Sequence, residues 1–132
     1  MSKAILDALK SRLYGTTALT NIFGTAIYLE QGPVGDNAPI LVYRSTGMRT
    51  TPMFGGVVRC ELDLEFRMNL GNSGDSAGHT AAAALQTALS TPLTSVTGFD
   101  RVRLIQTQSA VPSFEDDSWT MVETYRAVAH DT

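Results

Sequence analysis

A run of alternating apolar and polar residues constrains the fold of this chain more than any other feature. The apolar set is Val58, Cys60, Leu62, Leu64, Phe66, Met68 and Leu70. The polar set between them is Arg59, Glu61, Asp63, Glu65, Arg67 and Asn69. A period of two is the signature of a β-strand that buries one face and exposes the other. Because strands usually have about 5–6 residues, one this long is more typical of a ring, tube or barrel component than of a small enzyme.

The remaining elements follow from apolar spacing and from residues that start or stop helices. Apolar residues at helical spacing predict a helix over residues 2–14 and an alanine-rich helix over 75–91. A short helix is expected between Thr17, as its cap, and Gly24. Further strands are predicted over residues 26–29, 40–46, 101–108 and 118–129.

These elements predict an α+β fold. The expected architecture is a mainly antiparallel sheet of about four to five strands. Two main helices pack on one face of it, in the order ααββ(long)αββ. A length of 132 residues suits one domain, residues 1–132, with its own core.

Composition excludes several classes of function. The net charge of −3 argues against general affinity for nucleic acids or membrane surfaces, which requires basic patches. No stretch approaches the roughly 18 apolar residues of a membrane span, and the first residues lack the apolar core of a signal peptide. The single cysteine excludes an intrachain disulfide framework and a multi-cysteine metal site. We expect a protein that is made and kept in cytosol-like conditions until assembly.

Residues that could perform catalysis are few. Neither His79 nor His130 has a partner at metal-ligand spacing, and Cys60 belongs to the apolar side of the long strand. The acidic residues 115–117 suit a solvated turn better than a cation site. We therefore predict that the chain is not an enzyme and holds no cofactor or metal.

The connector over residues 47–56 is the better candidate for function. It carries Arg49, Met53 and Phe54 between glycines, and such side chains are enriched at protein interfaces. The alternative is that Met53 and Phe54 fold back onto the core.

The order of segments resembles the phage tail terminator (tail-completion) family from about Ala4 to Ala129. The resemblance rests on the segments APILVYRSTG, VVRCELDLEFRMNL, SAGHTAAAALQTAL and DDSWTMVETYRAVA. It implies a virion protein that forms a hexameric ring at the head-proximal end of a tail tube. Such a ring stops tube polymerisation and joins the tail to a head-side connector, and DNA passes through it without specific binding. The resemblance brings no catalytic residues.

Within such a ring, residues 47–56 would reach a neighbouring subunit or the tube protein. Glu61, Asp63 and Glu65 would face the lumen as an acidic wall that repels phosphate, whereas plain solvent exposure is the alternative. Two other readings stay open. The chain could be another neck or tail component, such as the head-completion stopper or the tube protein, or it could be a ligand-binding or enzymatic α+β domain.

Overall fold

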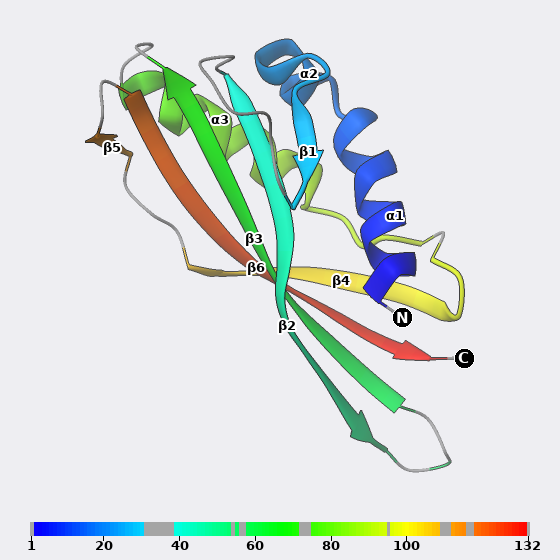
Figure 1. Ribbon diagram of the computed structural model, residues 1–132. Helices are drawn as coiled ribbons and strands as arrows, with labels where there is room; N and C mark the ends of the chain where they lie inside the picture. The colour runs from blue at the N-terminus through cyan, green and yellow to red at the C-terminus, as the bar shows by residue number, and fades with distance from the viewer. Residues whose placement is uncertain are drawn as a thin grey trace.

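The residues that the structure describes form three helices and a six-stranded, mostly antiparallel sheet (Figure 1). This computed structural model describes residues 2–30, 39–53, 55, 58–71, 75–94, 96–108, 112–115 and 118–131. In chain order the elements are α1 (Ser2–Tyr14), α2 (Thr17–Phe23), β1 (Ile27–Leu29), β2 (Ile40–Pro52), β3 (Val58–Gly71), α3 (Asp75–Ala88), β4 (Phe99–Gln108), β5 (Ser113–Glu115) and β6 (Ser118–Asp131).

The sheet has the strand order β1-β2-β3-β6-β4, with β5 paired to β6 off this path. All pairs are antiparallel except β1 with β2. The long alternating run lies in the centre, because β3 pairs with β2 on one side and with β6 on the other. The prediction of an α+β fold with a mainly antiparallel sheet is confirmed.

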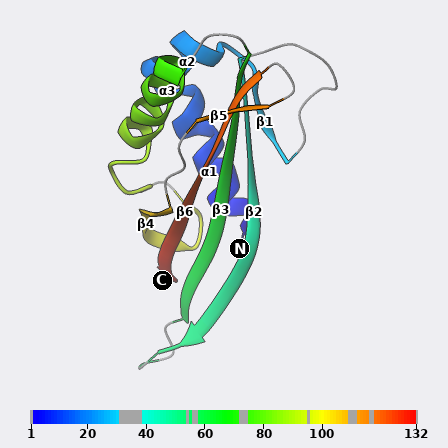
Figure 2. The ribbon, with the colours of Figure 1, turned by 90° about the vertical axis from the view of Figure 1, so that its left-hand side faces the viewer.

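Helices α1 and α3 lie on the same side of the sheet (Figure 2). From Cys60 to Leu70, every apolar residue of β3 faces these helices and is at most 2% exposed, whereas the polar residues between them are not buried. The alanine stripe of α3 packs on this core through Ala81, Ala84 and Ala88, since small side chains allow a helix to approach closely. We call the side of the sheet away from the helices the outer face.

Strand β2 is much longer than its sequence pattern predicted. It continues to Pro52, so residues 47–52 of the predicted connector are strand. A register shift, typical of a β-bulge, lies between Ser45 and Gly47. A strand interrupted in this way need not show a continuous alternation of apolar and polar residues. Pairing with β3 beyond that shift, such as Arg49 with Glu61, holds the segment extended.

Other predicted boundaries also need correction. Three residues with a turn-like sequence form β5, in which Phe114 contacts Trp119 with ring centroids 5.4 Å apart. The sheet therefore has six strands rather than four to five. Helix α3 ends at Ala88 rather than at residue 91, and the cap of α2 is Thr16 rather than Thr17.

The ends of β2 and β3 run past the helices as an arm (Figures 1 and 2), along which β3 stays paired with β6 as far as Arg59. We call residues 46–52 and 58–62 the distal hairpin. Strand β1 pairs only with residues 41–43, so no described strand covers the outer backbone edge of β2 along this hairpin. An uncovered edge presents free N–H and C=O groups to a partner strand.

Candidate functional site

The outer face carries a network of ion pairs centred on β3. Glu61 Oε2 lies 3.1 Å from Arg49 Nη2, and Glu61 Oε1 lies 3.2 Å from Arg59 Nε. Arg126 Nε donates a hydrogen bond of 2.9 Å to Asp63 Oδ1, and its Nη1 lies 3.7 Å from Glu61 Oε2. That hydrogen bond, together with the negative charge of Asp63, raises the pKa of the Arg126 guanidinium.

A second part of the network surrounds Glu65. Its Oε1 lies 3.3 Å from both Arg44 Nε and Arg67 Nη2. The side chains of Glu61 and Glu65 are only 19% and 16% exposed, whereas those of Arg44, Arg49 and Arg67 are 49%, 59% and 61% exposed. The carboxylates therefore lie beneath a layer of guanidinium groups.

This layering changes the electrostatic character predicted for the face. Six arginines and three carboxylates lie on the outer face among the side chains that the structure describes. They are Arg44, Arg49, Arg59, Arg67, Arg103, Arg126, Glu61, Asp63 and Glu65. Their formal charge is +3, although the whole chain carries −3. Arginines pair with Glu61, Asp63 and Glu65, and that these carboxylates form the acidic wall of a lumen stays a prediction.

The three predicted contact residues of the connector fall in different places. Arg49 lies within β2 rather than in a loop, and it pairs with Glu61. Met53 follows β2 directly and is 45% exposed. Phe54 lies outside the described residues. The hairpin thus presents Arg49 and Met53 together with Met48, which is 49% exposed.

Sequence reasoning missed Arg44, Arg103 and Arg126. Each occupies an outward position of a different strand, opposite or next to the polar residues of β3 in the sheet. The available signal was that arginine recurs in every long predicted strand on the side opposite the apolar residues. Its meaning depends on strand order, which the sequence pattern did not provide.

The candidate catalytic residues do not come together. Cys60 is fully buried, and burial raises the pKa of its thiol, which suppresses the nucleophilic thiolate. His79 is exposed on α3, and the side chain of His130 lies outside the described residues. Of the acidic corner, only Glu115 is described, as the last residue of β5. Among the described residues, no three His, Cys, Asp or Glu side chains lie close enough to hold a metal ion.

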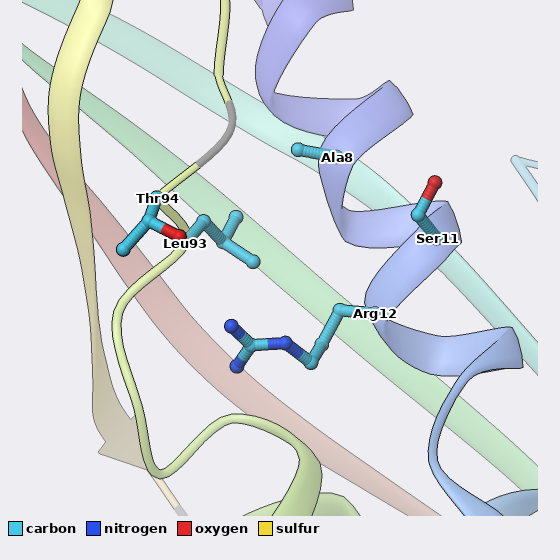
Figure 3. Close-up of a pocket in the computed structure, with 5 residues that line it drawn as sticks. All are labelled: Ala8, Ser11, Arg12, Leu93 and Thr94. Carbon is cyan, nitrogen blue, oxygen red and sulfur yellow. The ribbon is translucent and has the colours of Figure 1, made fainter.

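A hollow of about 290 Å³ lies between α1 and the segment after α3 (Figure 3). Ala8, Ser11, Arg12, Leu93 and Thr94 line it. The guanidinium of Arg12 already has hydrogen-bond partners within the chain. It donates to the carbonyl oxygens of Ala88, Thr91 and Pro92 at 2.8–3.0 Å. Arg12 therefore joins α1 to the end of α3, and this structural role explains its position at the hollow.

A buried polar cluster lies on the helix side of the sheet. Gln106 Nε2 donates to Glu123 Oε2 at 2.5 Å, and Gln86 of α3 donates to Gln106 Oε1 at 3.1 Å. Glu123 is 1% exposed. Burial and the nearby Glu123 raise the pKa of Tyr125 to about 12. These contacts tie α3 to β4 and β6.

A sheet with an uncovered edge, a projecting hairpin and an ion-paired outer face is typical of a structural assembly component. The model of the family described as Tail completion protein gp17 matches residues 7–130. The chain therefore belongs to the tail completion protein gp17 family, and it is a structural protein of the phage tail and a virion component.

Solved structures share this fold. A chain of the virion of a native gene transfer agent particle matches with a TM-score of 0.68 and 19% identity, covering 98% of this chain and 96% of that one. A second solved structure matches with a TM-score of 0.58 and 15% identity, covering 98% of this chain and 95% of that one. Comparison with curated proteins found no significant match. No helix in the described part of the chain is long and apolar enough to cross a membrane.

Proposed function

We propose that this protein forms a closed ring that caps the head-proximal end of the tail tube. The ring ends tube polymerisation and joins the tail to the head-side connector or stopper protein. Six copies is the number that the resemblance to tail terminators implies. The observation that carries the proposal is the distal hairpin, which extends past the helices with one uncovered edge.

The two ends of the sheet support ring closure because they differ. Strand β2 forms one edge of the sheet over residues 46–52. Strand β4 is the last strand at the opposite end and pairs with β6. A contact between two different patches on successive copies is heterologous and closes into a ring when the rotation permits. An arm that carries Arg49, Met53 and Phe54 would make this contact or reach the tube protein.

The outer face would then line the channel through which DNA passes. In this arrangement Glu61, Asp63 and Glu65 face the lumen, and Glu61 and Glu65 lie beneath their arginine partners. The helices would lie on the outside of the ring, where α1 and α3 shield the core from solvent.

The test compares assembly and capping by the wild type and by matched variants. Light scattering and negative-stain imaging should find rings of about 85 kDa, six times 14.2 kDa, formed alone or on a tube. Added during assembly of purified tube protein, the wild type should shorten the tubes. Unlimited tubes of this protein alone would make it the tube protein, and tubes of unchanged length would contradict capping.

The hairpin variant Arg49→Ala/Met53→Ser tests the arm. It should lose ring formation and capping while keeping the wild-type circular dichroism spectrum. The matched control Lys10→Ala/Leu29→Ser also removes one cation and one exposed apolar side chain, but away from the hairpin, and should assemble normally. Equal assembly by both variants would contradict the role of the arm.

A further inference from the structure

The cations of this chain are concentrated on one side of the molecule. Among the described side chains, strand pairing places six arginines on the outer face against three carboxylates. These side chains carry a formal charge of +3, whereas the whole chain carries −3. A partner that approaches the sheet meets a field opposite in sign to the net charge.

Arg44, Arg49 and Arg67 are also more exposed than their carboxylate partners. The side chains of Arg49 and Arg67 are about 60% exposed, and Arg103 is exposed with no ion-pair partner among the described residues. Glu61 and Glu65 pair with guanidinium nitrogens of Arg44, Arg49 and Arg67 and so restrict these side chains. A guanidinium fixed in this way loses little freedom on binding and still has donors for a second, outer anion.

The spacing of the charges suits a linear polyanion. From Arg59 to Arg67 the strand rises roughly 27 Å, since each residue adds about 3.3–3.4 Å. Duplex DNA advances about 3.4 Å per base pair, so this length spans roughly eight base pairs. Arginine binds phosphate oxygens through a planar fork of N–H donors. A wall rich in carboxylates would instead repel the phosphate.

We propose that the outer face binds the phosphate backbone of double-stranded DNA, without sequence specificity, through Arg44, Arg67, Arg103 and the arginines of the distal hairpin. The choice of duplex DNA rests on the proposed function, in which this face lines the channel. Glu61 and Glu65 weaken the phosphate contacts of Arg44, Arg49, Arg59 and Arg67, because each of these arginines shares its charge with one of the two carboxylates. Such contacts exchange rapidly and allow the DNA to slide.

The test measures binding of a fluorescent 30-base-pair duplex by anisotropy, between about 25 and 200 mM NaCl, with the protein in its own oligomeric state. The wild type should bind at low salt, with an affinity that falls linearly on a log–log plot against salt concentration. Arg67→Gln/Arg103→Gln should lower the affinity about tenfold at 50 mM salt and reduce the slope by about 1.8, the value for two lost phosphate contacts. Lys3→Gln/Lys10→Gln on α1 removes the same charge and should bind like the wild type.

Three results would overturn the inference. The first is no wild-type binding at 25 mM salt, and the second is an equal loss of affinity in both variants, which would mean that only net charge matters. The third is a double arginine variant that binds DNA normally but fails to assemble, which would mean that the arginines contact an acidic protein surface. Ring formation and capping are measured on the same samples, so intact capping without DNA binding rejects this inference and leaves the proposed function standing.

Discussion

At the scale of single residues, Cys60 is a test of how completely the core is closed. Its side chain is fully buried, and burial raises its thiol pKa. We expect a thiol reagent such as DTNB to label the native protein at least roughly 100-fold more slowly than the urea-unfolded protein, because the reactive thiolate forms only after opening. Thr97→Cys in a Cys60→Ala background provides an exposed control that should be labelled at once. Fast labelling of native Cys60 would contradict its place in the core.

Tyr125 predicts how the stability of the protein depends on alkaline pH. Its pKa is about 12 in the folded protein, whereas tyrosine in an unfolded chain has a pKa of about 10. As the pH rises, the unfolded state therefore loses its proton first. The stability that Tyr125 contributes is complete below pH 10 and is lost as the pH rises towards 12.

Tyr125→Phe should remove this part of the alkaline destabilisation. Urea unfolding at pH 8 and at about pH 10.5 should show a fall in the free energy of unfolding that is about 1 kcal/mol smaller in the variant than in the wild type. At pH 8 the variant should lie within about 1 kcal/mol of the wild type, because the Tyr125 hydroxyl has no hydrogen-bond partner among the described residues. Tyr28→Phe in β1 is the control and should keep the full alkaline fall.

At the scale of elements, Arg12 holds two helices together. Its guanidinium donates to three carbonyl oxygens at the end of α3 and to Thr91 Oγ1, all within 3.0 Å. These oxygens are at the negative end of the α3 dipole, where a cation is stabilising.

Arg12→Ala should lower the free energy of unfolding by about 2 kcal/mol, the range for hydrogen bonds to a charged group. The free energy of unfolding of Arg12→Lys should lie between those of Arg12→Ala and the wild type, because an ammonium group cannot contact all of these oxygens at once. Urea denaturation is the measurement, with Lys10→Ala on the same helix as the control. A loss no larger than that of Lys10→Ala would show that the clamp adds no stability.

Gly78 sets how closely α3 approaches the rest of the fold. A Cβ atom at this position would lie 2.6 Å from Pro112 Cγ and 3.5 Å from Leu70 Cδ1. A proline ring has little freedom to move, so the added methyl group forces the helix outward.

Gly78→Ala should destabilise the protein by about 1–3 kcal/mol, although alanine normally favours a helix over glycine by up to about 1 kcal/mol. Ala83→Gly, at an exposed position of α3, measures the difference in helix propensity between alanine and glycine. It should lower the free energy of unfolding by about 1 kcal/mol. Thermal or urea unfolding of both variants shows whether the steric contact or the helix propensity dominates at position 78. A gain in stability for Gly78→Ala would mean that the contact with Pro112 is not close.

At the scale of the whole molecule, one continuous core joins all the main elements. The buried cluster contains residues of α1, α2 and α3 together with β2, β3, β4 and β6. The chain should therefore unfold as the single domain that its length predicts.

Urea unfolding followed by Trp119 fluorescence and by far-ultraviolet circular dichroism should give coincident transitions. Trp119 reports on the start of β6, while circular dichroism reports on all elements, including the helices. An earlier fluorescence transition would mean that β5 and the start of β6 separate from the remaining fold before the core opens. That result would contradict a single cooperative unit.

Much of the fold could be predicted because its signals are local. The alternation of β3 alone gives its buried face, including Cys60, and the spacing of leucines in residues 2–14 gives α1. The prediction failed where an element depends on a distant partner. Residues 47–52 lack alternation and become strand by pairing with β3, and the three residues of β5 pair with the start of β6.

The candidate site was predictable only in part for the same reason. The sequence correctly gave β3 a charged side, and it located exposed Met53. It did not place Arg126 against Asp63, which is 63 residues away, or Arg44 against Glu65. The pairing of these carboxylates with arginines is therefore visible only once the strand register is known.

The sequence by itself determined the fold class, the buried face of the central strand and the absence of a disulfide framework, because periodicity and composition act through neighbours along the chain. Only the tertiary structure decided the length of the distal hairpin, its uncovered edge and the arginine layer above Glu61 and Glu65. Those features depend on strand order and register, which bring together residues that no local pattern connects. Coulomb interactions depend on distance in space, so the charge of the outer face became evident only when the strands were side by side.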